Sequence, residues 1–382
     1  MIIGKLHIED FPTCVYFYLK GSFRKELIQK CALFGGVNYK ELSKQFGVPY
    51  QTLLNWKAGR RAMPIKALWK IQSTLQGDPI ISQLNENVTA YKMKAGKLIT
   101  DPNLPITFDE RAITLLVHLM ADGYAADGQM PSYCNYDPQV LEEMKSCLQM
   151  FGNVPVRIRD KKKGKEILIP TIVLKLIKKF FGEVRFGSHE CRIPTVIQTA
   201  PLKAAAVAVR AFADDEATVL ARCIRFYSIN SAFLNDIRSP LINRFSMRNI
   251  PHGIPESSIS PIRKSTGRSA FYFDITSKGL KPYQELIGFT HTKKRLKLAL
   301  WVNRVLASNW HHNPKGVTKG KILEELIKGP KTAKQLSEAV GVRKQVISGY
   351  FLKKLAEEGV VTPIKEARIR GNLWFMKSTD SN

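Results

Sequence analysis

Two apolar stretches that each end in an acidic residue constrain this sequence most. Residues 115–123 end in Asp122 and a glycine, and residues 209–217 end in Glu216 and an alanine. Each stretch is long enough for about two and a half turns of α-helix. Because glycine adopts the left-handed conformation without steric cost and commonly ends helices, we expect Asp122 in the last turn of the first helix.

A carboxylate at a helix C-terminus is mildly unfavourable unless a cation lies beside it, because that end has a partial negative charge. Two such ends brought together would form a site of hard oxygen ligands, which suits Mg²⁺. One such stretch alone usually indicates only a core helix, but two stretches 94 positions apart with similar sequences after them favour an internal duplication. Small residues that would let the two helices approach closely recur at helical spacing: Thr114, Ala121, Ala204, Ala208 and Ala211.

The two stretches resemble the paired motifs of the LAGLIDADG (dodecapeptide, DOD-type) homing endonucleases. Asp122 and Glu216 match the last acid of the motif, and residues 212–216, Phe-Ala-Asp-Asp-Glu, are similar to the form common in archaeal members. Residues 117–118, Val-His, stand where a small and an aliphatic residue are usual, and Ala217 replaces the final glycine. The resemblance implies an α+β fold with a pseudo-dimeric core of two αββαββα-like repeats.

The resemblance also implies a function, a site and a metal. It implies a monomeric, site-specific double-strand DNA endonuclease that hydrolyses phosphodiesters with Mg²⁺ or Mn²⁺ and without an organic cofactor. Asp122 and Glu216 would be catalytic and would bind the metal. Lys278 is the best match in the second repeat for the basic residue that the family keeps near the metal, and residues 170–171 show no clear equivalent in the first. Residues 283–295 resemble the closing segment of archaeal repeats.

The charge balance indicates a polyanionic partner. Lys and Arg exceed Asp and Glu by 27 and the isoelectric point is near 9.8. The excess is +9 in residues 1–100, +11 in 101–314 and +7 in 315–382, so every part could contact one phosphate backbone and binding would depend strongly on salt. The six cysteines include no CxxC pair, which argues against zinc, and no apolar run is long enough to span a membrane. We expect a soluble, cytoplasmic (nucleoid-associated) protein.

Residues 1–76 are predicted to form a DNA-binding module. Residues 1–20 read as a short strand pair, and residues 39–61 resemble a helix-turn-helix of the phage-repressor type, with Gly47 at the sharp turn. The alternative is a helical hairpin with a solvated basic face. Residues 77–108 are predicted to be a polar, Pro-containing connector. The residues expected to contact a major groove or phosphates are Gln51, Thr52, Asn55, Lys57, Arg60 and Arg61.

The duplicated core is predicted to span residues 109–308, with repeats at 109–200 and 201–308. After each acidic helix we expect a strand, a helix (137–151; 233–245), basic strands (156–169; 262–275) and a closing helix (173–182; 280–289). The basic hairpins are either DNA-contacting ribbons that fit a major groove or charged edges that prevent aggregation; the matched pair favours DNA. Their candidate DNA-binding residues are Arg157, Arg159, Lys161, Lys162, Lys163, Lys165, Arg263, Lys264 and Arg268.

Residues 317–379 resemble a winged helix. One face of the first helix is predicted to hold Ile322, Leu323, Leu326 and Ile327, Thr332 would cap the second helix, and Gly341 would end it. Val346, Ile347, Leu352 and Leu355 should organise the third helix, with a basic hairpin as the wing. Winged helices bind either DNA or other proteins, and we favour DNA. The outward-facing candidates are Arg343, Lys344, Gln345 and Ser348.

Two other functions compete with the nuclease. A regulator of the same fold could bind DNA and have lost cleavage, and the two extra helical modules favour it, whereas a regulator has no need of paired acids. An RNA maturase is a third option, but helical modules that read B-form major grooves argue against it. Because the chain starts with Met and ends in Thr-Asp-Ser-Asn, we expect a free-standing protein rather than an intein.

Overall fold

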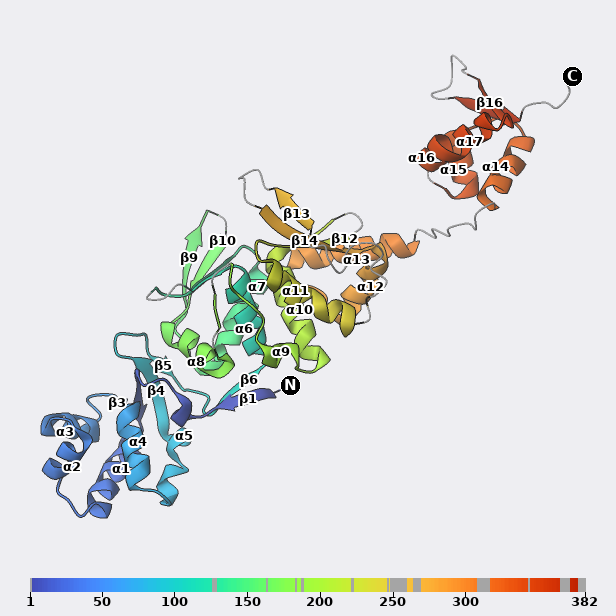
Figure 1. Cartoon of the computed structure of the whole chain (residues 1–382). Helices are drawn as coiled ribbons and strands as arrows, with labels where there is room; N and C mark the ends of the chain where they lie inside the picture. The colour runs from blue at the N-terminus through green and yellow to red at the C-terminus, as the bar shows by residue number, and fades with distance from the viewer. Residues whose placement is uncertain are drawn as a thin grey trace, which may run out of the picture. The chain divides into compact units, whose positions relative to one another are not determined.

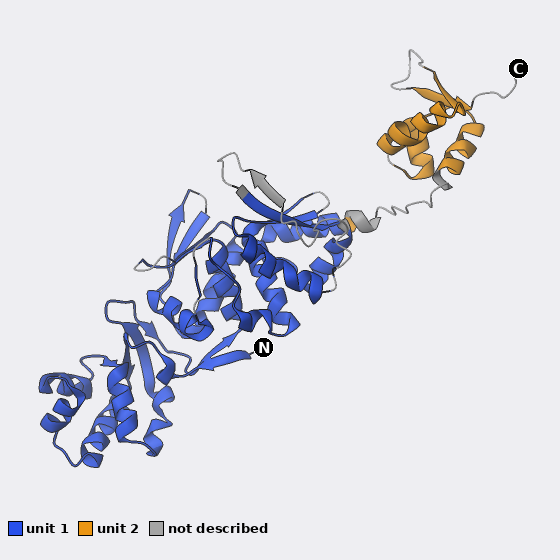
Figure 2. Cartoon of the chain, viewed as in Figure 1, with its two compact units in different colours: residues 1–302 blue, residues 303–382 orange. Residues whose placement is uncertain are grey.

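The computed structural model consists of helices and small antiparallel sheets in a mixed α+β arrangement (Figure 1). Contacts divide the chain into two units, residues 1–302 and 303–382, which we describe separately (Figure 2). No helix in the described part is long and apolar enough to cross a membrane. The structure describes residues 2–125, 129–162, 164–182, 184–186, 189–220, 223–245, 247, 260–263, 269–307, 317–342, 344–364 and 372–376.

The N-terminal part of unit 1 joins a small helical group to a four-stranded sheet. Asn38 accepts hydrogen bonds from the backbone N–H groups of Lys40 and Glu41 and so caps α2, and Gly47, with φ of 66°, makes the left-handed turn before α3. Leu42 and Phe46 of α2 and Leu53 and Trp56 of α3 are buried. The elements are β1 Ile2–Leu6, β2 Val15–Leu19, α1 Gly21–Phe34, α2 Tyr39–Phe46, α3 Tyr50–Ala58, β3 Met63–Pro64, α4 Ile65–Thr74, α5 Leu84–Asn87, β4 Val88–Met93, β5 Ile99–Thr100 and β6 Ile106–Asp109.

Two predictions for this part differ from the structure. Residues 1–20 do form two strands, but the strands do not pair with each other: β1 pairs with β6, and β2 lies in a sheet of order β3-β2-β4-β5. Residues 77–108 were expected to be a connector, yet they contain three strands. Tyr91 and Phe108 from these strands are fully buried, and the Tyr91 hydroxyl donates to the carbonyl of Phe151. Long-range pairing of this kind leaves no local sequence signal.

The middle part of unit 1 contains the same order of helices and strands twice. The sheets have equivalent strand orders, β7-β8-β10-β9 and β11-β12-β14-β13. The first set is α6 Glu110–Ala121, β7 Gly123–Tyr124, β8 Ser132–Asn135, α7 Pro138–Leu148, β9 Arg157–Lys161, β10 Gly164–Leu168 and α8 Thr171–Phe181. After α9 Thr195–Gln198, the second set is α10 Leu202–Glu216, β11 Ala217–Val219, β12 Cys223–Ser228, α11 Ser231–Asn243, β13 Ser260–Arg263, β14 Ser269–Thr276 and α12 Ser277–Leu286, followed by α13 Thr292–Ala307.

Helices cover one face of each sheet. In the second sheet Ile224 and Phe226 of β12 point to the helical side, where the Phe226 ring packs against Phe212 of α10 and Phe273 of β14. The alternate residues of β12, among them Arg225, are only half-buried because they lie on the other face. The second sheet therefore has one face in the core and one face free of its own helices.

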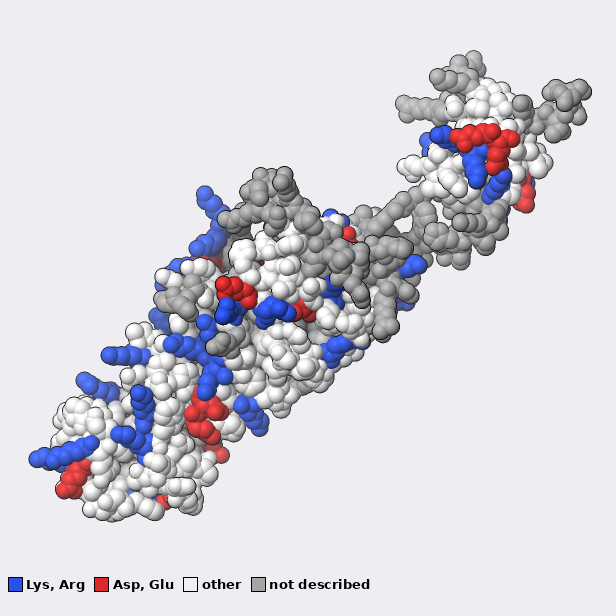
Figure 3. Space-filling view, in the orientation of Figure 1, with Lys and Arg blue, Asp and Glu red and all other residues white. Residues whose placement is uncertain are grey.

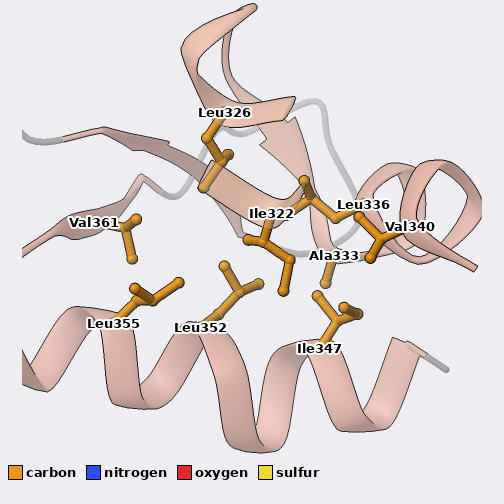
Figure 4. Close-up of a cluster of buried hydrophobic side chains, with 9 residues drawn as sticks. All are labelled: Ile322, Leu326, Ala333, Leu336, Val340, Ile347, Leu352, Leu355 and Val361. Carbon is orange, nitrogen blue, oxygen red and sulfur yellow. The ribbon is translucent and has the colours of Figure 1, made fainter. Parts of the chain in front are cut away.

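Unit 2 is built around nine buried apolar side chains, drawn in Figure 4. Thr332 caps α15 in a box with Gln335, and Gly341 ends this helix in the left-handed conformation, both as predicted. Two predicted core positions are wrong: Ile327 is 72% exposed and Val346 is 38% exposed. The elements are α14 Val317–Ile327, β15 Lys331–Thr332, α15 Ala333–Val340, α16 Lys344–Val346, a π-helical turn Ile347–Phe351, α17 Leu352–Glu357, β16 Val361–Ile364 and β17 Leu373–Met376.

Candidate functional site

The helices α6 and α10 pack against each other, which brings the two acidic ends together (Figure 1). Asp109 caps the start of α6 by accepting from the backbone N–H of Arg111, and Pro201 precedes the start of α10. Asp122 is the C-terminal capping residue of α6, and Glu216 is the last residue of α10. The small residues predicted for this contact are buried, apart from the half-buried Ala121. Small side chains allow this close approach.

Gly123 is required after Asp122 for a reason other than the predicted one. Its backbone belongs to β7 and is not left-handed. A Cβ atom at this position would instead lie 2.5 Å from the Cα atom and the carbonyl oxygen of Leu119 in the last turn of α6. Glycine therefore lets the chain turn back against the helix end, and the left-handed helix stop that we predicted is wrong.

The charge of Asp122 is poorly compensated in the folded chain. The residue has an exposed surface, but burial of its carboxyl group and the negative charge of Asp215 raise its pKa to about 6. Lys294 and His118 act in the opposite direction without cancelling the shift. A carboxylate in such surroundings gains from a nearby cation.

Asp215, next to Glu216, is the centre of a buried network that the sequence analysis missed. Its carboxylate accepts from His118 Nδ1 at 2.7 Å, from the Tyr133 hydroxyl at 2.5 Å and from Asn135 Nδ2 at 3.2 Å. The side chains of His118 and Asp215 are both fully buried. Since these residues come from α6, β8 and α10, the network joins the two acidic helices beneath their ends.

His118 has a second acidic neighbour. Its Nε2 atom lies 3.8 Å from Glu143 of α7, which is also 3.6 Å from Arg210 of α10. Burial alone would lower the pKa of His118, but the charge and hydrogen bond of Asp215, together with Glu143, outweigh burial and raise the pKa to about 10. The imidazole is therefore a buried cation at neutral pH, at the position where the sequence departs from the usual aliphatic residue.

Lys294 of α13 supplies a cation at the end of α10. Its ammonium donates to the carbonyl oxygens of Ala213, Asp214 and Asp215, at 3.0, 2.6 and 3.3 Å. These carbonyls belong to the last turn of α10, where the helix dipole is negative. The pKa of Lys294 is lowered, because the effect of burial exceeds the opposite effect of four nearby carboxylates, which include Asp122 and Glu216. The only sequence signal for this residue was the likeness of residues 283–295 to a closing segment.

The segment before α13 is held by carboxylates from both sets of elements. Asp214 accepts from the backbone N–H groups of Thr290 and His291 at 3.1 and 2.9 Å, and Asp137, which caps α7, accepts from Thr292 N–H at 2.9 Å. Asp214 is buried, and burial raises its pKa to about 6 despite these hydrogen bonds. This segment thereby links α7, α10 and α13, and it positions Lys294.

Glu216 lines a small cavity of about 210 Å³ between the two acidic helices. Met120 and Ala121 of α6 and Phe212 of α10 also line it. Among the described residues, no group of three or more His, Cys, Asp or Glu side chains is arranged to hold a metal ion. A divalent cation here would thus need ligands beyond the protein carboxylates, such as phosphate oxygens or water.

The predicted basic residue Lys278 lies near the start of α12 and is exposed. The lysine that lies among the acids is Lys294. The structure places the predicted DNA-contacting residues on two exposed elements of unit 1, α3 with its following turn and the β9–β10 hairpin, and Figure 3 shows Lys and Arg side chains over this part of the surface. Gln51, Arg60, Arg61, Arg157, Arg159, Lys161, Lys162 and Lys165 are exposed, whereas Thr52, Asn55 and Lys57 are half-buried.

Lys57 is the exception among these cations, because its ammonium donates to the Tyr39 hydroxyl at 2.9 Å and lies 4.1 Å from the centre of that ring. In unit 2, Lys344, Gln345 and Ser348 are exposed on one helical segment. The other candidates cannot be placed: Lys163, Lys264, Arg268 and Arg343 lie outside the described residues, as does the side chain of Arg263.

Comparisons with known proteins give weak likenesses. No family model matches the sequence, and no curated protein matches it. Among solved structures, this chain is similar to the homing endonuclease I-DmoI in complex with DNA and Mn, with 10% identity, a TM-score of 0.33, and coverage of 47% of this chain and 96% of that chain. I-WcaI bound to its DNA recognition sequence has 9% identity, a TM-score of 0.33, and coverage of 47% and 80%.

Full-length DUF199/WhiA from Thermatoga maritima has 13% identity, a TM-score of 0.34, and coverage of 67% of this chain and 94% of that chain. All of these TM-scores lie below 0.5, and the sequence identities are low. The likenesses therefore establish no family for this chain.

Proposed function

We propose that this chain is a site-specific double-strand DNA endonuclease of the LAGLIDADG homing type that acts as a monomer. One observation supports this most: the helices α6 and α10 pack together and end side by side, each with a carboxylate, Asp122 or Glu216. Two similar sets of strands follow these acids, so each acid is associated with one DNA strand of the target. Because the two sets differ in sequence, the target need not be palindromic.

The donor set fits a hard divalent cation, Mg²⁺ or Mn²⁺. Asp122 and Glu216 would each hold one such cation over a scissile phosphate, and the raised pKa of Asp122 reflects a negative charge that a cation relieves. Such a cation would stabilise the leaving oxygen and activate water for attack on the phosphate. Lys294 keeps the last turn of α10 in place through three carbonyl bonds, and the His118–Asp215 pair does the same from below. These residues orient Glu216 relative to Asp122.

Four parts of the chain would recognise the DNA sequence. In unit 1, α2 and α3 form a helix-turn-helix that enters a major groove, and the β9–β10 and β13–β14 hairpins contact the target on either side of the acids. In unit 2, the helices and the β16–β17 hairpin form a winged helix that extends the footprint. The net charge of +27 supports DNA as the partner.

A DNA-binding regulator that does not cut is the second candidate, and two observations favour it. Lys294 already occupies the carbonyls at the end of α10, and His118 already pairs with Asp215, so internal cations offset part of the acidic cluster. In addition, the described residues include no preformed group of three metal-binding side chains. A protein that only binds DNA would need neither metal nor cleavage geometry.

Cleavage of a supercoiled plasmid separates the two functions. The plasmid should contain the genomic sequence that flanks the gene, rejoined without the gene, and the reaction should run at low salt with Mg²⁺ or Mn²⁺. Asp122→Asn and Glu216→Gln are the test variants, and Glu142→Gln, which changes an exposed acid on α7, is the matched control. A gel shift in Ca²⁺ measures binding independently of cutting.

We expect the wild type and the Glu142→Gln variant to linearise the plasmid, and each test variant to nick it or leave it intact. Unchanged gel shifts would show that the test variants still bind. Specific binding by the wild type without cutting in either metal would instead support the regulator. Failure to bind either this plasmid or random duplex DNA would contradict both candidates.

A further inference from the structure

An ion pair on the helix-free face of the second sheet joins β12 to β14. Arg225 and Asp274 are directly opposite each other in the antiparallel register. Arg225 Nε donates to Asp274 Oδ1 and Nη2 donates to Oδ2, both at 2.7 Å. This is the side-on bidentate arrangement, in which a planar guanidinium fits a carboxylate and loses most of its freedom to rotate.

An aromatic ring also contacts one face of the same guanidinium. The central carbon of the Arg225 guanidinium lies 4.3 Å from the ring centre of Tyr272, which is also on β14. Tyr272 is paired with Tyr227 in the strand register, two residues from the Arg225–Asp274 pair. The arginine is therefore fixed by a carboxylate at one edge and by a ring at one face. A side chain that is already ordered loses less entropy when it binds a partner.

The bonds to Asp274 leave the outer edge of the guanidinium available. A guanidinium has five N–H donors, and Asp274 uses only the one on Nε and one on Nη2. The other three, on Nη1 and Nη2, have no acceptor among the residues that the structure describes. The side chain of Arg225 is 28% exposed, so a partner can reach it. Two parallel N–H donors at this edge match the O6 and N7 acceptors of guanine in the major groove.

The Arg225–Asp274 pair lies near Glu216, the acid of the second set of elements. Arg225 is opposite Thr218 in the β11–β12 register, and Thr218 is two residues after Glu216. Arg225 is therefore two residues along a strand and one strand across from Glu216. This separation corresponds to roughly 8 Å, or about two to three base-pair steps. A base contacted by Arg225 would thus lie close to the phosphate that faces Glu216.

The first sheet has no such pair. The register positions equivalent to Arg225 and Asp274 are Ser132 of β8 and Leu168 of β10, which face each other and are both only 7% exposed. Neither side chain can donate two parallel hydrogen bonds to a base edge. The two sets of elements therefore differ in chemistry at one symmetric position.

We propose that Arg225, oriented by Asp274 and Tyr272, reads a guanine in the half of the target that faces the second set of elements, with no counterpart in the other half. This inference rests on the proposed DNA-binding function and adds a specificity-determining residue to it. It does not depend on cleavage, because base reading needs only binding.

The test is in vitro selection of bound sequences from a randomised duplex pool. The wild-type chain is used in Ca²⁺, so that binding is selected without cutting, and the enriched sequences give a preferred base at each position. The test variants are Arg225→Ala and Arg225→Lys. Lysine keeps the positive charge for phosphates but lacks the planar pair of donors, so it separates base reading from charge. Circular dichroism melting verifies that each variant is folded.

The matched control is Arg192→Ala. Arg192 makes a bidentate pair with Asp236 of α11, with both distances 2.7 Å like those of Arg225, but this pair joins the segment before α9 to a helix and not two strands of the sheet. Loss of a surface arginine–carboxylate pair is therefore common to control and test, and only the test removes the proposed guanine contact.

We expect one strong guanine near the centre of the wild-type consensus, off the centre of pseudo-symmetry. Both Arg225 variants should lose preference at that position alone, by about 10- to 100-fold, while Arg192→Ala keeps the full consensus. A consensus that keeps the guanine in both Arg225 variants overturns the inference and leaves the proposed function standing. A wild-type chain that enriches no sequence overturns both.

Discussion

At the residue scale, the structure depends on buried charges that lie under the two acidic helix ends. His118 and Asp215 are fully buried and 2.7 Å apart, and Lys294 is bound to the last carbonyls of α10. A buried ion pair adds little net stability compared with an apolar pair, but removal of one partner is costly because the other charge then stays buried alone. Single substitutions in this network should therefore have large effects.

His118→Leu should destabilise unit 1 by about 3 kcal/mol at pH 6, because Asp215 loses its cation. The folded-state pKa of His118, about 10, lies above the ordinary value of 6.5. Its stabilisation is therefore complete below pH 6.5 and is lost as the pH rises to about 10. Urea denaturation at pH 6, 8 and 10 should show a difference from the wild type that shrinks with pH. His189→Phe, at an exposed histidine, is the control. A difference that is independent of pH would contradict the charged assignment.

Asp122→Asn should stabilise the metal-free protein at pH 8 and leave it unchanged at pH 4. The pKa of Asp122 is raised to about 6, so folding is penalised once the pH exceeds 3.8, and the full penalty applies above 6. After allowance for solvent screening, we expect a gain of about 1 kcal/mol. Millimolar Mn²⁺ should raise the melting temperature of the wild type but not that of Asp122→Asn. Equal shifts in both proteins would argue against a metal at this residue.

At the element scale, the end of α6 and the β9–β10 hairpin are the features most open to test. The first is close-packed, since β7 turns back against the helix. The second projects basic side chains, and every residue of β9 is exposed. Lys161 and Lys165 lie near Glu166 and Asp160, whereas no described acid pairs with Arg157 or Arg159.

Gly123→Ala should cost at least about 2 kcal/mol, because the new Cβ atom would lie 2.5 Å from backbone atoms of Leu119 and one of the two segments must move. Gly21→Ala is the control: Gly21 begins α1 in the same unit, and its Cβ would meet only the end of a flexible arginine, at 3.8 Å. Thermal unfolding monitored by circular dichroism measures both. Equal melting temperatures for the two variants would show that the approach at Gly123 is not tight.

The double variant Arg157→Gln/Arg159→Gln should weaken binding to random duplex DNA and reduce the slope of log K against log salt by about 2, one for each lost phosphate contact. Fluorescence anisotropy across a salt series gives the slope. Lys145→Gln on α7, where the lysine already pairs with Glu142, should leave it unchanged. If the hairpin is only a charged edge, the double variant will keep the wild-type slope.

At the scale of the whole molecule, the two units should unfold separately. Unit 2 has its own core of nine buried side chains, in residues 322–361, and its own three-stranded sheet. A domain of this size is marginally stable but can fold alone. Residues 303–382 expressed alone should unfold cooperatively in calorimetry, and their removal should leave the main transition of unit 1 in place. Loss of that transition would contradict two independent cores.

The sequence by itself determined the local elements. Helical periodicity, the caps at Asn38 and Thr332 and the glycine turns at Gly47 and Gly341 depend on neighbours within a few residues, so the helices and their order could be predicted. It also determined that two acidic stretches would end helices, because an apolar run interrupted by an acid is a local pattern.

Only the tertiary structure decided which residues meet at these ends. The pairing of His118 with Asp215 spans 97 residues, and that of Lys294 with the carbonyl of Asp214 spans 80. Residues 77–108, which we predicted as a connector, likewise contain strands β4 and β6 that pair with β2 and β1, far away along the chain. Contacts of this kind are set by the packing of distant elements. No spacing along the sequence specifies them, because chain connectivity limits distance only between near neighbours.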